Sequence, residues 1–157
     1  MAKTEMQSII RHLNNTLDGE PWFGRPVFRL LGEIDSTIAY RKLTPSAHSP
    51  IELLYHMLTW ADFTLKRIQK DKINDLEAFE KLDWREIDPK IHDWDEGLGA
   101  LIATHQEISA LLQQKDDSFL EEKVDYREYD FRVLLNGLIE HNIYHAGQVA
   151  LLKKMMS

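Results

Sequence analysis

Two histidines, His141 and His145, stand four residues apart near the C-terminal end of the chain. Four residues of an α-helix turn through about 400°, so both imidazoles would project from one face of a helix. Histidine is the side chain that most often binds a metal ion at neutral pH. The spacing therefore predicts a metal site, although pairs at this spacing also arise by chance.

The two histidines lie on a helical stripe that is otherwise mostly apolar. Its 4-3-4-3-4 spacing is typical of a helix packed in a bundle. Two polar side chains that face a core need a common partner, because unpaired burial costs each roughly 1–3 kcal/mol. A metal ion would supply that partner. The stripe consists of Leu134, Leu138, His141, His145, Gln148 and Leu152.

A third candidate ligand, His56, lies on an earlier predicted helix. Ser49 is a favourable N-cap and Pro50 suits the first helical position, so we expect a helix from there to about residue 70. His56 falls on an apolar stripe with Trp60 and Phe63. Three inward histidines from two helices can hold an ion and leave coordination positions open. Taken alone, however, a histidine on an apolar face is more often a hydrogen-bonded core residue. The polar face expected to meet water consists of Glu52, Tyr55, Thr59, Asp62 and Lys66.

The remaining histidines are weaker candidates. His105 lies on the inward stripe of a helix predicted over 91–113, which begins at Ile91. It could be a fourth ligand, a hydrogen-bond donor behind the ligands or a core residue, and the last two are favoured. His12, His48 and His92 receive no role.

Polar and aromatic neighbours of the candidate ligands suggest further roles. Gln148 is one position along the stripe of His145 and is a candidate for contact with a ligand or a substrate. Trp60 and Tyr144 could wall a pocket, although aromatic residues on such stripes more often serve packing. We expect the carboxylates of Glu52, Asp62 and Glu140 to be solvated or paired with surface cations, so no general base is assigned.

The composition is that of a compact folded domain. The 157 residues are 43% hydrophobic and 10% aromatic, which predicts one domain over 1–157 with a sizeable core. The net charge of −7 argues against nucleic acid or an anionic membrane as a partner. The chain has no cysteine, so it has no thiolate nucleophile and no cysteine-ligated zinc. The N-terminus has no apolar signal core, and no apolar run approaches the roughly 18 residues of a membrane span, which predicts a cytoplasmic protein.

Proline- and glycine-containing segments that interrupt helices divide the chain into four long predicted helices. These are predicted over about 4–17, 50–70, 91–113 and 131–155, with short helical pieces over 27–33 and 36–43. The apolar residues of the connection over 71–88 do not follow a regular helical spacing, but the connection is long enough to cross a bundle from end to end. A charged loop covers 115–130. The sequence therefore predicts an all-α four-helix bundle, a fold in which metal sites commonly form between facing helices.

Two segments of the chain resemble the DinB/YfiT-like superfamily. They are LLYHMLTW around His56 and HNIYHAGQ from His141 to Gln148. The resemblance implies a ligand triad of one histidine from the second long helix and two from the last, which maps onto His56, His141 and His145. It also implies an up-down-down-up helix order, a divalent ion such as nickel or zinc, and a homodimer. Relatives include S-transferases and isomerases that use bacillithiol, mycothiol or glutathione.

An ion held by three neutral histidines supports two kinds of chemistry. It can lower the pKa of bound water from 15.7 towards about 7, or it can bind the thiol of a small cofactor. The sequence therefore predicts a metal-dependent hydrolase or thiol S-transferase acting on a small molecule that the sequence does not identify. The alternative is a non-catalytic metal-binding or stress-related structural dimer. A cavity that reaches the metal would favour the enzyme, since structural sites fill their coordination.

A second apolar stripe on the last helix bears on assembly. One bundle has one central core, so an additional stripe would face a flanking helix or another subunit. Together with the resemblance, this predicts a homodimer of two-fold symmetry. The stripe consists of Leu135, Ile139, Ile143, Ala146 and Ala150.

Overall fold

The computed structural model describes residues 3–157, and within that range the protein contains seven α-helices, one short 3-10 helix and no strand. The predicted all-α class is confirmed. None of the helices in this range has the length and apolarity that crossing a membrane requires. The elements are α1 (Glu5–Asp18), α2 (Val27–Gly32), α3 (Ser36–Ala39), α4 (Pro50–Ile68), α5 (Leu76–Leu82), α6 (Trp94–Leu112), the 3-10 helix η1 (Asp117–Glu121) and α7 (Phe131–Met156).

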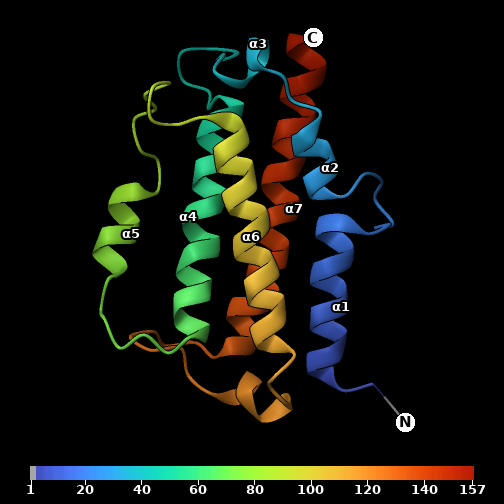
Figure 1. Cartoon of the computed structure of the whole chain (residues 1–157), viewed down its shortest axis with the longest axis vertical. Helices are drawn as coiled ribbons and strands as arrows, with labels where there is room; N and C mark the ends of the chain where they lie inside the picture. Colours follow the sequence, from blue (N-terminus) through green and yellow to red (C-terminus); the bar gives the residue numbers. More distant parts are fainter. Residues whose placement is uncertain (1–2) are drawn as a thin grey trace.

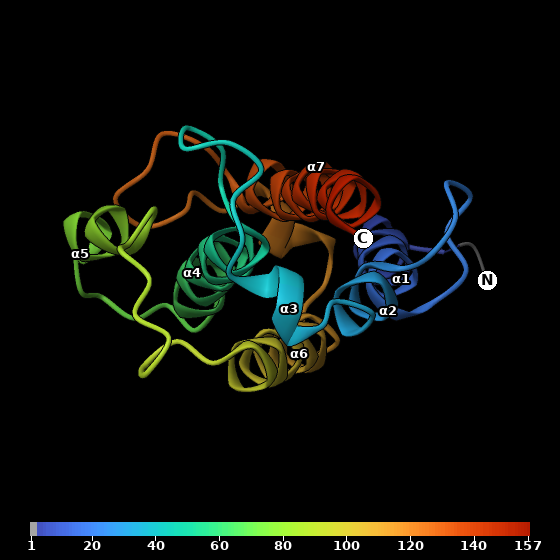
Figure 2. The same cartoon turned by 90° about the horizontal axis from the view of Figure 1, so that it is seen from above.

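The four long helices α1, α4, α6 and α7 lie side by side (Figure 1). In that view α1 and α7 run upward, whereas α4 and α6 run downward. Seen from above, the four surround a common interior, and α3 lies over one end of it (Figure 2). The connection between α4 and α6 crosses the full height of the molecule and carries α5 on the outside of α4.

Side-chain caps fix where the long helices begin. Thr4 and Ser49 each form a capping box, with Gln7 and Glu52 respectively, and Pro50 occupies the first turn of α4 as predicted. The helix predicted over 91–113 begins three residues later, because the Asp93 side chain accepts a hydrogen bond from the backbone N–H of Glu96.

Ile91 therefore lies before α6 rather than on its inward stripe. Its side chain is 67% exposed, so the predicted inward position was wrong. From Trp94 onward the same stripe is buried, as expected, through Leu101 and Ile108 to Leu112, with Leu98 half-buried.

Helix α4 is buried on almost every side, and this corrects the predicted polar face. Tyr55 and Thr59 were expected to meet water, but both are buried. The segment that follows α4 folds back over them: the Thr59 hydroxyl contacts the Leu82 carbonyl at 3.4 Å, and the Tyr55 hydroxyl donates to the Asp93 carbonyl at 3.0 Å. On the α6 side a Cβ atom at Gly97 would lie 2.9 Å from the Tyr55 ring, so only glycine allows this approach. The neighbours of α4 thus hold it, and His56 with it, in place.

The second apolar stripe of α7 packs inside the protein. Leu135, Ile139 and Ala146 are buried in the core, and Ile143 and Ala150 pack against it. Of the two predicted alternatives, a flanking helix and another subunit, this burial fits the first, since α7 contacts α1, α2 and α4. The homodimer stays a prediction that rests on the resemblance.

Candidate metal centre

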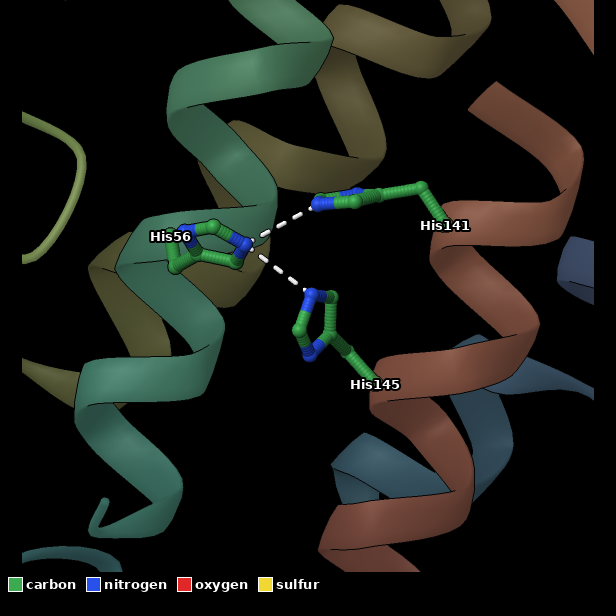
Figure 3. A group of neighbouring side chains, drawn as sticks. All are labelled: His56, His141 and His145. Carbon is green, nitrogen blue, oxygen red and sulfur yellow. Dashed lines mark hydrogen bonds between the residues drawn. The ribbon is translucent and has the colours of Figure 1, made fainter. Parts of the chain in front are cut away.

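His56 from α4 meets His141 and His145 from α7 in the interior of the protein (Figure 3). The Nε2 atom of His56 lies 2.9 Å from Nε2 of His145 and 2.9 Å from Nε2 of His141. One ligand atom from each ring falls within 4.8 Å of the others. His56 and His145 are buried and His141 is partly buried. The structure thus brings together the three histidines that the sequence singled out.

Two of the rings have an oxygen atom next to Nδ1, the ring nitrogen that does not take part in the Nε2 contacts. Oδ1 of Asp83 lies 2.6 Å from Nδ1 of His56, and Oε1 of Gln148 lies 2.6 Å from Nδ1 of His145. The carboxylate of Asp83 lies off the ideal N–H direction, so this contact is close in distance but is not a linear hydrogen bond. An oxygen this close to a ring nitrogen still favours a proton on that nitrogen, because two lone pairs would repel. Both rings therefore carry their proton on Nδ1 and leave Nε2 as a bare lone pair.

Facing lone pairs at 2.9 Å need a positive partner between them. Neutral His56 and His145 with protons on Nδ1 cannot hydrogen-bond to each other through their Nε2 atoms. Two nitrogens bound to one ion at about 2.1 Å, with an angle of about 90° between the bonds, are about 3 Å apart. The observed 2.9 Å separations match that spacing. The cluster could therefore hold a divalent ion.

Burial keeps the three rings neutral, as a metal ligand must be. It lowers the pKa of His56, His141 and His145 below the ordinary value of 6.5. For His141 burial acts together with the charges of His145 and His56, and the pKa falls to about 3. The carboxylate of Asp83 opposes the effect at His56 without reversing it. At neutral pH all three imidazoles are thus available as ligands.

His105 does not join the cluster. Its Nε2 atom lies 3.3 Å from the Asn142 amide nitrogen, and the ring packs against Phe28 with centroids 6.0 Å apart. Burial lowers its pKa to about 4. His105 is therefore a core histidine, one of the two favoured readings. Of the three histidines without a role, His12 is exposed and the Nδ1 atom of His92 accepts from the backbone of Asp88.

The carboxylates behave largely as expected. Glu52 caps α4 through Ser49 and pairs with Lys42 at 3.4 Å, and Glu140 is exposed. Asp62 differs, because it is half-buried and accepts a hydrogen bond from Thr104, and burial raises its pKa. None of the three touches the histidine cluster, so none is a general base for it.

Sequence reasoning missed Asp83 and Trp84, which both belong to the surroundings of His56. The Trp84 ring stacks on the His56 ring with centroids 3.8 Å apart, and His48 stacks on its other face at 3.7 Å. The indole N–H of Trp60 donates to Asp83 at 2.7 Å and steadies the carboxylate. Asp83 and Trp84 lie in a connection without helical periodicity, so no spacing signalled their position.

A cavity of about 270 Å³ between α4 and α7 reaches the cluster through His141. Trp60 forms part of its wall, which is the less favoured of the two roles considered for it. Tyr144, the other aromatic candidate for the wall, is 66% exposed and does not line the cavity, although its ring lies 5.0 Å from that of His145.

The fold and the three-histidine cluster define a class of helical proteins with an internal histidine cluster that could hold a metal ion. Within that class the chain belongs to the DinB superfamily, which it matches over residues 4–149. The match covers all seven α-helices except the end of α7, and it includes every member of the cluster. No curated protein and no solved structure gives a significant match.

Proposed function

We propose that this protein is a metal-dependent enzyme, a hydrolase or a thiol S-transferase, built on an up-down-down-up four-helix bundle. His56, His141 and His145 are the proposed ligands of one divalent ion, nickel or zinc. The observation that carries the proposal is the cavity at His141, next to a cluster that supplies only three ligands. Three protein ligands leave coordination positions for a substrate, whereas a structural site fills them with protein.

The residues next to the cluster orient its histidine rings and shield them from water. Asp83 and Gln148 hold the rings of His56 and His145 with their Nε2 atoms turned inward. Trp84 covers the flat face of His56 and limits how water approaches it. A divalent ion at this position would activate either water or a bound thiol as the nucleophile. The chain itself has no cysteine, so a reacting thiol would come from a small cofactor.

Elemental analysis of protein purified without added metal tests the first half of the proposal. We expect about one nickel or zinc ion per chain, held by three histidines. A screen of ester hydrolysis and of thiol transfer to electrophiles tests the second half. Activity should disappear on chelation and return when the ion is restored. A reaction that survives complete removal of metal would refute the proposal, and so would a chain that binds no divalent ion.

A further inference from the structure

The cavity beside His141 has a chemical character that narrows the class of substrate. None of the side chains in its wall is a carboxylate, an ammonium or a guanidinium group. Most of the wall is aromatic or aliphatic, and includes Phe63, Val133, Leu134 and Leu138. Such a surface favours an apolar guest, because apolar area removed from water is stabilising.

Two of the polar groups in the wall are already engaged within the protein. The Thr64 hydroxyl donates to the Trp60 carbonyl at 2.8 Å, and the Trp60 indole N–H donates to Asp83 at 2.7 Å. A charged guest would therefore lose most of its water and could gain only the Tyr129 hydroxyl and Nδ1 of His141 as partners, which is costly. The carboxylates of a peptide-like thiol do not suit this wall, whereas the apolar part of an electrophile does.

The size of the cavity sets the size of the guest. A protein cavity of about 150 Å³ lined by aliphatic and aromatic side chains is large enough to bind benzene. The cavity beside His141 measures about 270 Å³ and has room for such a ring with a short substituent.

We propose that this cavity binds an uncharged apolar group, the size of a substituted benzene ring, of the small-molecule substrate. The inference rests on the proposed function, because the polar end of the substrate would then meet the ion at the cluster. A guest in the cavity touches the side chain of His141, and Nε2 of that residue is one of the converging nitrogens. The substrate is thus an aryl-bearing electrophile or ester rather than a charged metabolite.

Gly137 allows the cavity to be closed without disturbing the cluster. It lies in the cavity wall, and a Cβ atom there would meet no other atom within 4 Å. The variant Gly137→Leu should therefore fill the cavity. Gly147 is the matched control: it lies on the same helix, is exposed, also has open space at its Cβ position and does not line the cavity. Glycine-to-leucine changes in one helix have the same effect on helix propensity.

The probes are three hydroxamates that share one metal-binding head group, tested on zinc-loaded protein. Benzohydroxamate should bind at least about tenfold more tightly than acetohydroxamate, because its ring leaves water. 4-Carboxybenzohydroxamate should lose most of this gain. In Gly137→Leu the gain should shrink to about twofold or less, with metal content and acetohydroxamate affinity unchanged, while Gly147→Leu keeps it. Equal affinity of the first two probes in the wild type, or a gain that survives in Gly137→Leu, would overturn the inference.

The two proposals fail in different ways. If neither zinc nor nickel loads, the proposed function is wrong. Binding of benzyl alcohol to metal-free protein, followed by the amide NMR shifts of Gly137 and Leu138, then still decides the nature of the cavity. Shifts that are absent in Gly137→Leu and present in Gly147→Leu support the apolar cavity, and a wild type without shifts contradicts it.

Discussion

The cavity between α4 and α7 and the cleft between α1 and α6 each have a histidine in the wall, but their surroundings differ. The cleft is the larger, at about 840 Å³ against about 270 Å³, and His105 lies in its wall. Asn14 and Ser109, which also line the cleft, are joined by a hydrogen bond of 3.0 Å. The largest cavity is the usual first choice for a binding site. Here the smaller one adjoins the group of residues that can do chemistry.

The difference lies in what the buried histidines face. His105 has an amide as its partner on one side, and its Nδ1 atom has no partner. His56 and His145 instead direct bare Nε2 atoms at each other, with oxygen atoms behind both rings. Burial is common to both places and lowers the pKa in both. Convergence of nitrogen atoms, rather than burial or cavity size, therefore marks the candidate metal centre.

Removing one histidine from each place should give the largest contrast. We expect His145→Ala to lose the divalent ion and His105→Ala to retain it, although both variants delete a buried imidazole. The loss of affinity in His145→Ala should exceed the roughly 10–100-fold effect of losing a residue behind a ligand. Isothermal titration with zinc and elemental analysis measure both. Equal metal content in the two variants would contradict the assignment of the ligands.

Most of the fold could be predicted from local signals in the sequence. The Ser49–Pro50 start of α4 was predicted because caps act over a few residues, and the stripes of α6 and α7 followed from helical spacing. One failure was local, because the Asp93 cap starts α6 after Ile91, and the other depended on distant parts of the chain. Tyr55 and Thr59 were placed in water because nothing in α4 itself reveals that a later segment covers it.

The candidate site likewise has residues that local spacing predicts and residues that it does not. His141 and His145 are four residues apart on one helix, so their proximity could be predicted, and His56 lay on a comparable stripe. Asp83 approaches His56 across 27 residues of chain from a segment without a repeating pattern. Its position is decided by the path of the connection around α4, which depends on packing and not on local spacing.

Acid should destabilise the metal-free protein through His105. Burial lowers its pKa from 6.5 to about 4 in the folded state, so between these values the unfolded chain binds more protons. The contribution of His105 to the free energy of unfolding therefore falls as the pH drops below about 6.5, by about 3 kcal/mol in total and by about 2 kcal/mol from pH 7.5 to pH 5. Urea unfolding in the presence of a chelator measures the sum of this contribution and that of the clustered histidines.

The His105→Gln variant isolates this effect from the three clustered histidines. It cannot titrate at this position, so its stability should fall by about 2 kcal/mol less than that of the wild type over the same pH range. Taking the difference removes the contributions that both proteins share. Parallel pH profiles for the two proteins would show that His105 is not the group responsible.

The smallest effect concerns the carboxylate behind His56 and tests whether the oxygen atoms shape the cluster. In Asp83→Asn the charge beside Nδ1 of His56 is lost, while Trp60 can still donate to the amide oxygen. We expect zinc affinity to fall roughly 10–100-fold, because a neutral partner holds the ring and its protonated Nδ1 less firmly. Glu86→Gln is the matched control, since it removes an exposed carboxylate three residues away in the same connection. An equal loss of zinc affinity in both variants would reflect net charge alone. Asp83 would then not orient His56, and His56 would lack the positioning partner that distinguishes it from His105.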